Sequence, residues 1–192
     1  AADTNAEIKD LEVMLNGINL IDNAVITTVG NTTTYKIAIN RGPTDVDLID
    51  YTLLSNVATV SESWGSDLSL IAGGTRTFTI DVTAQNPAHK KKYVVEITQK
   101  NDDNAITKIE VNGDEVDFGG AFSKTIEVNY SVKNVTFAIT TSDQYATAYV
   151  NGQTSYGPLT LKGGANIFTI YARSERGEKG SEYTLTINQK IP

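Results

Sequence analysis

The sequence predicts an all-β chain folded as two tandem antiparallel β-sandwiches. Residues 73–100 and 163–190 both open with Gly-Gly, continue through Phe-Thr-Ile to a Tyr, and close with Gln-Lys, at a constant offset of 90 residues. A fixed period of this length indicates one folding unit used twice. Apolar residues alternate with Thr, Asp and Glu along both units, and we find no window with a helical period. One apolar face and one wet face are typical of antiparallel sheets.

The repeat divides the 192 residues into two units of common domain size. We expect a first sandwich over residues 1–100, a short linker over 101–104 and a second sandwich over 105–192. A linker this short is not a flexible tether, so we expect restricted swivel between the two sandwiches.

Each unit is expected to open with a strand that ends in a tight turn. The apolar spacing of residues 8–13 returns in residues 106–111, and the dipeptides Asn16-Gly17 and Asn112-Gly113 follow. Asn-Gly supplies the two positive φ values that a two-residue hairpin turn requires.

The last third of each unit is expected to form a long hairpin. In the first unit Phe78, Ile80 and Val82 alternate with polar residues, and residues 93–97 continue with Tyr, Val and Ile at every second position. Short strands separated by turns at intervals of roughly ten residues indicate about seven strands per unit and two packed sheets. A closed barrel is the alternative, but residues 40–67 are too long and too irregular in pattern to close one.

Composition excludes several classes of function. The net charge is −7, with 8 basic and 12 acidic residues in 1–100 and 8 and 11 in 101–192, so neither half carries the basic surface that nucleic-acid binding needs. No apolar run approaches the ~20 residues that span a bilayer, so we expect no membrane insertion by this segment. The absence of Cys excludes disulfides and thiolate metal sites.

The repeated residues resemble the bacterial cadherin-like β-sandwich repeat. The opening Ile-x-x-Leu/Ile-x-Val, the central Gly-Gly-x-x-x-Phe-Thr-Ile and the final Tyr-x-Leu/Val-x-Ile carry the resemblance, which covers residues 105–190 well and 8–100 less closely. Several bacterial immunoglobulin-like families share such an ending, so the resemblance implies an immunoglobulin-like or cadherin-like sandwich rather than one subfamily. It further implies tandem modules of secreted or envelope-bound proteins, acting as spacers or adhesive elements without catalytic residues.

Catalysis is not expected from the residues themselves. The single histidine, His89, lies between Pro87-Ala88 and a run of three lysines, in a stretch that we expect to be a solvated loop. A general base needs an oriented nucleophile and a pocket, and no motif of either kind accompanies His89. We therefore expect no enzyme.

Calcium is the one metal for which the sequence offers candidate ligands. Asn101, Asp102, Asp103 and Asn104 place four side-chain oxygens in the predicted linker. Calcium takes six to eight oxygen ligands, so other loops would have to complete the site. The alternative is that Asn and Asp serve as linker residues because they hydrogen-bond their own backbone. No other cofactor is expected.

Three aromatic residues are candidate ligand contacts. Trp64 lies in a polar stretch that looks like a loop, where an exposed ring could stack on a sugar or anchor a partner. The alternative is a core residue. Tyr145 and Tyr149, four residues apart, could form an exposed aromatic strip on one strand face if Ala146, Ala148 and Val150 face the core.

We therefore expect a non-catalytic structural or adhesive module of an exported bacterial protein, either secreted or at the cell surface. The alternatives are an accessory carbohydrate-binding module and a phage virion decoration or fibre domain. The expected partners are neighbouring modules of the same polypeptide and a cell-surface protein or polysaccharide.

Overall fold

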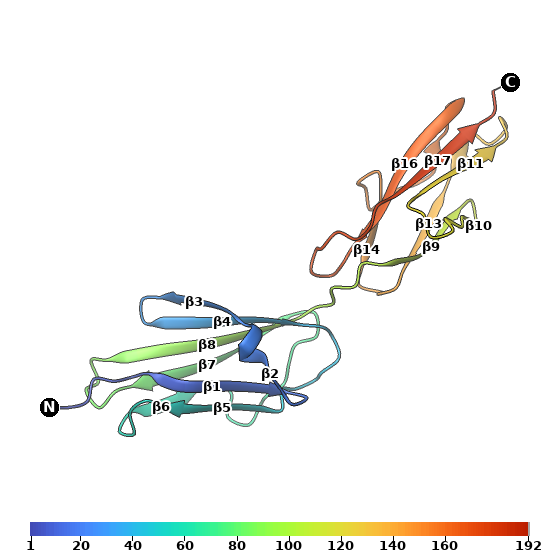
Figure 1. Ribbon diagram of the computed structural model, residues 1–192. Helices are drawn as coiled ribbons and strands as arrows, with labels where there is room; N and C mark the ends of the chain where they lie inside the picture. Colours follow the sequence, from blue (N-terminus) through green and yellow to red (C-terminus); the bar gives the residue numbers. More distant parts are fainter. Residues whose placement is uncertain (192) are drawn as a thin grey trace. The chain divides into compact units, whose positions relative to one another are not determined.

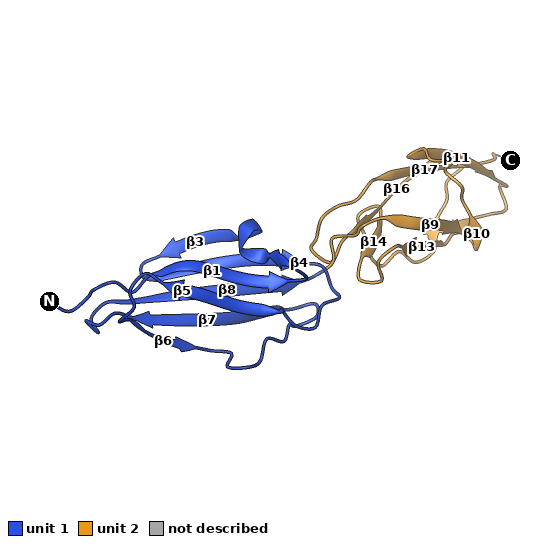
Figure 2. Ribbon diagram, turned by 60° about the horizontal axis from the view of Figure 1, so that its bottom comes forward, with its two compact units in different colours: residues 1–100 blue, residues 101–192 orange. Residues whose placement is uncertain are grey.

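The computed structural model describes residues 1–191. These residues divide into two compact units, residues 1–100 (unit 1) and residues 101 onward (unit 2), which Figure 2 shows in different colours. Both units consist of strands joined by turns, and the described chain has one short helix, the 3₁₀ helix η1 (Leu20–Asn23). The all-β prediction is confirmed.

Unit 1 contains two sheets, whose strands are labelled in Figure 1. The smaller sheet has the order β2-β1-β5, and the larger sheet has the order β3-β4-β8-β7-β6. The strands are β1 (Ile8–Leu15), β2 (Ile18–Asn19), β3 (Val25–Val29), β4 (Thr32–Ile39), β5 (Leu48–Leu53), β6 (Thr59–Glu62), β7 (Thr75–Thr83) and β8 (Lys90–Gln99).

Unit 2 also has a smaller and a larger sheet. Its sheets have the orders β10-β9-β13 and β11-β17-β16-β14, and a two-stranded ladder pairs β12 with β15. The strands are β9 (Ile106–Val111), β10 (Asp114–Glu115), β11 (Ser123–Val128), β12 (Asn134–Val135), β13 (Phe137–Thr141), β14 (Thr147–Val150), β15 (Leu159–Thr160), β16 (Gly164–Arg173) and β17 (Tyr183–Gln189).

One strand pair in each unit departs from the antiparallel arrangement that the sequence predicts. β4 runs parallel to β8 over 8 register positions, and β11 runs parallel to β17 over 6. Alternation does not reveal direction, because a strand presents the same two faces whichever way its neighbour runs. The described residues form eight strands in unit 1 and nine in unit 2, above the expected seven, because two-residue ladders add to the count.

Both predicted Asn-Gly turns are confirmed. Asn16 and Asn112 have φ values of 50° and 53°, and the glycines that follow them have 78° and 90°. Two successive positive φ values are typical of a type I′ turn, whose twist matches that of the flanking strands. Local sequence therefore determines how each unit begins.

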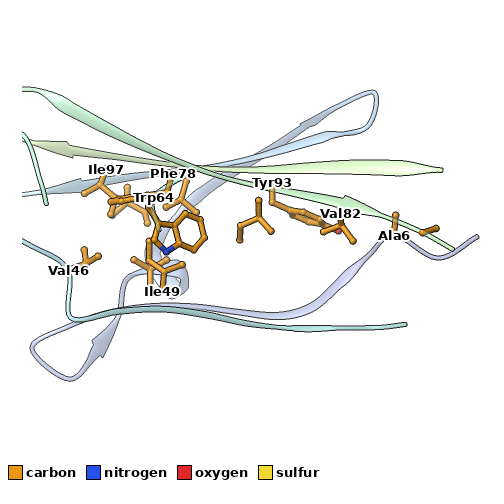
Figure 3. Packing of buried hydrophobic residues seen from close by; sticks show 13 residues of the cluster. Ala6, Val46, Ile49, Trp64, Phe78, Val82, Tyr93 and Ile97 are labelled. Atoms are coloured by element: carbon orange, nitrogen blue, oxygen red, sulfur yellow. The ribbon is translucent and has the colours of Figure 1, made fainter. Parts of the chain in front are cut away.

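The core of unit 1 lies between its two sheets, as Figure 3 shows. Phe78, Ile80 and Val82 on β7 are fully buried, in agreement with their alternation. Val13 from β1 and Ile49 from β5 close the core from the smaller sheet. Burial of each large side chain contributes roughly 1.5–3 kcal/mol, so this layer dominates the stability of the unit.

On its two longest strands, the core of unit 2 follows the same pattern at positions 90 residues later. Phe168 and Ile170 on β16 and Leu185 and Ile187 on β17 are buried, and Ile109 of β9 packs from the other sheet. The repeat detected in the sequence is therefore a repeat of inward-facing positions on the two longest strands.

Candidate functional site

The predicted linker and candidate calcium ligands, residues 101–104, are hydrogen-bonded within unit 2. The Asn101 amide donates to Glu175 Oε2 at 3.1 Å, and the Asn101 carbonyl accepts from the Arg176 amide at 3.2 Å. The Asn104 side chain donates to a carbonyl of the same loop at 3.2 Å. This loop joins β16 to β17, so residues 101–104 are fixed along it.

The two carboxylates of this segment have partners within unit 2. Asp102 Oδ2 lies 3.5 Å from Arg176 Nη1, and Asp103 Oδ1 accepts from the Ala105 amide at 2.9 Å. Hydrogen bonds from the Ser142 side chain and from the Ala105 backbone lower the pKa of Asp103. Within residues 1–191, no group of three or more Asp, Glu, His or Cys side chains is arranged to hold a metal ion. Asp102 and Asp103 are thus not part of such a group.

Trp64 lies in the core of unit 1. Its side chain is 8% exposed, and its ring meets Phe78 edge-on with centroids 5.9 Å apart and planes at 85° (Figure 3). Burial leaves no ring face for a sugar, so the structure does not support Trp64 as a ligand contact and instead fits the core alternative. The residues next to Trp64 in the sequence are polar, so they predict an exposed loop, although the Trp64 ring itself packs against Phe78.

Tyr145 and Tyr149 do not share a strand face. Tyr145 lies in the turn before β14 and is 41% exposed, whereas Tyr149 lies within β14. Tyr149 stacks on its cross-strand partner Tyr171, with centroids 4.9 Å apart and planes at 8°. Lys179 Nζ lies 4.3 Å from the centre of the Tyr171 ring. Ring faces that meet each other stabilise the sheet and are not open to a sugar.

Two neighbouring hollows lie beside β9 and β10 of unit 2, and sequence reasoning missed both. One of about 240 Å³ is bordered by Phe118, Phe122 and Tyr183, and another of about 490 Å³ by Ile126 and Val128 on β11. They share a wall made by residues 115–117. The wall carries Glu115 and Asp117, and Lys108 and Lys124 also line the hollows, so charged groups of both signs border the apolar residues.

The aromatic side of this surface depends on a glycine pair. Gly119 and Gly120 have φ values of 58° and 80°, which bring Phe118 and Phe122 onto the same ring, that of Tyr183, with centroids 5.1 and 5.4 Å away. Phe122 remains 56% exposed. The sequence signal that could have revealed this cluster is the pair of Phe residues around Gly-Gly-Ala.

His89 lies in the loop before β8 and is exposed, as predicted. It borders a shallow hollow with Glu7 and Lys91. Glu7 Oε1 forms an ion pair with Lys91 Nζ at 2.5 Å, and this contact also raises the pKa of Lys91. Glu7, the acidic residue that borders this hollow, therefore has an ion-pair partner.

No helix among residues 1–191 has the length and apolar character needed to span a bilayer. Comparison with curated proteins finds no match to the chain. Among solved structures, fibronectin(III)-like modules of CbhA from Clostridium thermocellum share 12% identity, with a TM-score of 0.31, over 80% of this chain and 88% of theirs. The four N-terminal immunoglobulin domains of Dscam1 isoform 4.4 share 7% identity, with a TM-score of 0.30, over 97% of this chain and 47% of theirs. Likenesses this distant carry no argument about function.

The family comparison concerns unit 2. Residues 118–190 match the model of the cadherin-like β-sandwich domain. The matched range runs from the Phe118 aromatic cluster to the end of β17 and so includes the larger sheet and its buried strands. The resemblance to the cadherin-like β-sandwich family that the sequence predicted is thus confirmed over residues 118–190.

Proposed function

We propose that this chain is a non-catalytic structural module of an exported bacterial protein, secreted or surface-bound, and that it transmits tension between the parts of the polypeptide on either side. The cadherin-like match supports a structural module, and such domains are usually extracellular. The observation that carries the mechanical role is the position of the first and last long strands of each unit within their sheets.

These strands are interior strands, with a neighbour on both sides. In unit 1, β1 lies between β2 and β5, and β8 lies between β4 and β7. In unit 2, β9 lies between β10 and β13, and β17 lies between β11 and β16. A pull on the two ends of a unit therefore acts on strands that have a neighbour on both sides, although β2 and β10 pair with β1 and β9 over two positions only.

The ladders that flank β8 and β17 are the longest of each unit. β8 pairs with β7 over 9 positions and with β4 over 8, and β17 pairs with β16 over 7 and with β11 over 6. A pull along the strand axis loads all rungs of a ladder together, whereas a pull on an edge hairpin opens rungs one at a time. Forced unfolding is governed by the unfolding barrier, which is higher when many hydrogen bonds must break at once.

Single-molecule force extension of the chain between two reference domains tests this proposal. We expect two separate unfolding events, each releasing about 300–340 Å of chain, since an extended residue spans about 3.3–3.6 Å. Extension without discrete events would contradict the proposal.

Two neighbouring threonines of β4 supply a matched pair of variants. The Lys92 amide donates to the Asn31 carbonyl, so odd-numbered residues of β4 direct their backbone groups towards β8 and even-numbered residues towards β3. Thr33→Pro removes a donor of the β4–β8 ladder, and Thr34→Pro removes a donor of the β3–β4 ladder. We expect Thr33→Pro to lower the unfolding force of unit 1 far more than Thr34→Pro. Equal effects would show that the β8 ladder does not resist the pull.

The alternatives have less support from the site. A carbohydrate-binding module needs open ring faces, whereas Trp64 is buried and Tyr149 stacks on Tyr171. A phage virion decoration or fibre domain would share the fold and would be distinguished by its assembly into particles.

A further inference from the structure

β3 is an edge strand without the features that usually protect such edges. All five of its residues are exposed, and Val25, Ile26 and Val29 have 65, 55 and 81% of their surface in solvent. In Figures 1 and 2, β3 is the outermost strand of its sheet, with β4 on its inner side. Long, uncharged, apolar edges are templates for pairing with another strand.

Other edge strands of the larger sheets carry charge or are short. β6, at the opposite edge of the same sheet, has four residues and ends in Glu62. β11, at the corresponding edge in unit 2, carries Lys124 and Glu127. β3 reads Val-Ile-Thr-Thr-Val, without a charged residue. β3 also has no counterpart in unit 2, where β11 itself forms the edge.

We propose that β3 is an interaction surface for a second copy of this chain, which pairs antiparallel through its own β3 to join two five-stranded sheets into one. The charge pattern favours this occupant. The chain has a net charge of −7, which opposes self-association over most of the surface, whereas the β3 edge presents no charge to repel an identical strand. A charged strand from another protein would find no counter-charge on β3.

The hydrogen-bonding pattern sets the register of this pair. Even-numbered residues of β4 face β3, and the register places Thr32, Thr34 and Lys36 opposite Val29, Thr27 and Val25. The odd-numbered residues of β3 are therefore bonded to β4, and Ile26 and Thr28 direct their backbone groups to the free edge.

In a new ladder, the backbone groups that point to the free edge of one β3 must lie opposite those that point to the free edge of the other. Placing Ile26 opposite Thr28 of the second copy meets this condition and uses all five residues of β3. Thr27 then lies opposite Thr27, on the two-fold axis, as an isologous contact requires. Side chains directly opposite in an antiparallel pair lie about 4.5–5.5 Å apart at Cβ, so like charges placed there destabilise the pair and opposite charges stabilise it.

Five residues on each side form a small interface. A standard stable interface buries about 800 Å² per partner, which a five-residue ladder does not reach. We therefore expect a reversible dimer that is populated at high protein concentration or when many copies are anchored side by side.

Sedimentation equilibrium of the full chain over a range of concentrations tests the proposal. We expect the apparent mass to rise from 20.7 kDa towards twice that value. Thr27→Lys and Thr27→Glu should each remain monomeric, because two like charges meet on the axis, and an equimolar mixture of the two should recover the dimer. Thr125→Lys makes the same change at an exposed position of β11 and should dimerise as the parent chain does.

Tryptophan fluorescence and melting temperature check that each variant is folded. A parent chain that stays monomeric at every concentration overturns the proposal. So does a dimer that survives Thr27→Lys, a dimer lost in Thr125→Lys, or a mixture of the Thr27 variants that stays monomeric.

Discussion

Gln189 Nε2 donates a hydrogen bond of 2.6 Å to the carbonyl of Val132, and Gln99, its counterpart 90 residues earlier, donates one to the carbonyl of Pro43. Both glutamines are buried, with 2% and 1% of their surface exposed. Each terminates the last strand of its unit and fastens the loop that follows the strand running parallel to it. The repeated Gln-Lys is thus a repeated structural contact.

Replacement of Gln189 should destabilise unit 2. Gln189→Leu keeps the size of the side chain but removes the donor to Val132 and a second one, at 3.2 Å, to Tyr130. A buried polar group left without a partner costs about 1–3 kcal/mol, and these two hydrogen bonds are part-buried, so we expect a loss towards the lower end of that range in the free energy of unfolding. Urea unfolding followed by far-UV circular dichroism measures it.

Gln99→Leu is the matched variant in unit 1. The chain has a single tryptophan, Trp64, so tryptophan fluorescence follows unit 1 alone. Gln99→Leu should lower the fluorescence midpoint, and Gln189→Leu should leave it unchanged. A Gln189→Leu protein as stable as the parent would show that the contact with Val132 has no net value.

Truncation of Trp64 should be among the costliest single changes in unit 1. Trp64→Ala leaves a cavity against Phe78, and large aromatic-to-alanine changes in cores cost about 3–5 kcal/mol. Trp64→Phe retains a ring in the same site and should cost less. Thermal unfolding followed by circular dichroism compares the two variants, because both lack the tryptophan and its fluorescence. An unaltered melting temperature in Trp64→Ala would contradict the core assignment.

Acid should weaken unit 1 partly through Asp67. Hydrogen bonds from the Ser69 side chain and backbone, together with the Arg76 guanidinium at 2.8 Å, lower the pKa of the Asp67 carboxyl. A depressed pKa means that the carboxylate stabilises the folded state above its unfolded pKa of about 3.9 and loses this effect as the pH falls through the lower folded value.

Asp67→Asn should therefore flatten the acid side of the curve of stability against pH. The measurement is the Trp64 fluorescence midpoint in urea between pH 7 and pH 2. Asp22→Asn, an exposed carboxylate of η1, removes the same charge and is the control. If the urea midpoints of Asp67→Asn and of the parent chain fell equally between pH 7 and pH 2, the contribution of Asp67 would be ruled out.

Calcium should leave the melting temperature of the chain unchanged. Asp102 is paired with Arg176, and Asp103 accepts hydrogen bonds from its own unit, so neither carboxylate is aimed at a shared ligand position. A bound ion at one hundred times its dissociation constant would add about 2.7 kcal/mol, which calorimetry detects easily. Calorimetric melting curves recorded with calcium and with EDTA should give the same melting temperature. A calcium-dependent rise in the melting temperature that Asp103→Asn removes would instead establish a calcium site at residues 101–104.

Local pattern explains which predictions about the fold are accurate. Alternation identifies the buried residues of β7 and β8 because a strand sends every second side chain to the same face. The same alternation continues from Ile97 to Gln99, so the sequence pattern also predicts that Gln99 faces the core. The Asn16-Gly17 turn needs only the φ values that these two residues adopt readily.

Contacts between distant segments explain the rest. Trp64 has the polar neighbours of a loop residue, and only the fold shows that this loop returns to Phe78. Tyr145 and Tyr149 have strand-like spacing, but β14 begins after Tyr145, and Tyr149 meets Tyr171 from another strand.

By itself the sequence determined that this protein is built of strands, that residues 73–100 and 163–190 share one pattern, and which positions of the longest strands face inward. These properties follow from the spacing of neighbouring residues along one strand. The tertiary structure alone decided that β4 and β8 run parallel, that Trp64 is buried and that β3 forms an unprotected edge. Strand direction, edge position and the burial of a loop residue such as Trp64 depend on which distant segment lies alongside, and residue spacing within a strand does not specify that neighbour.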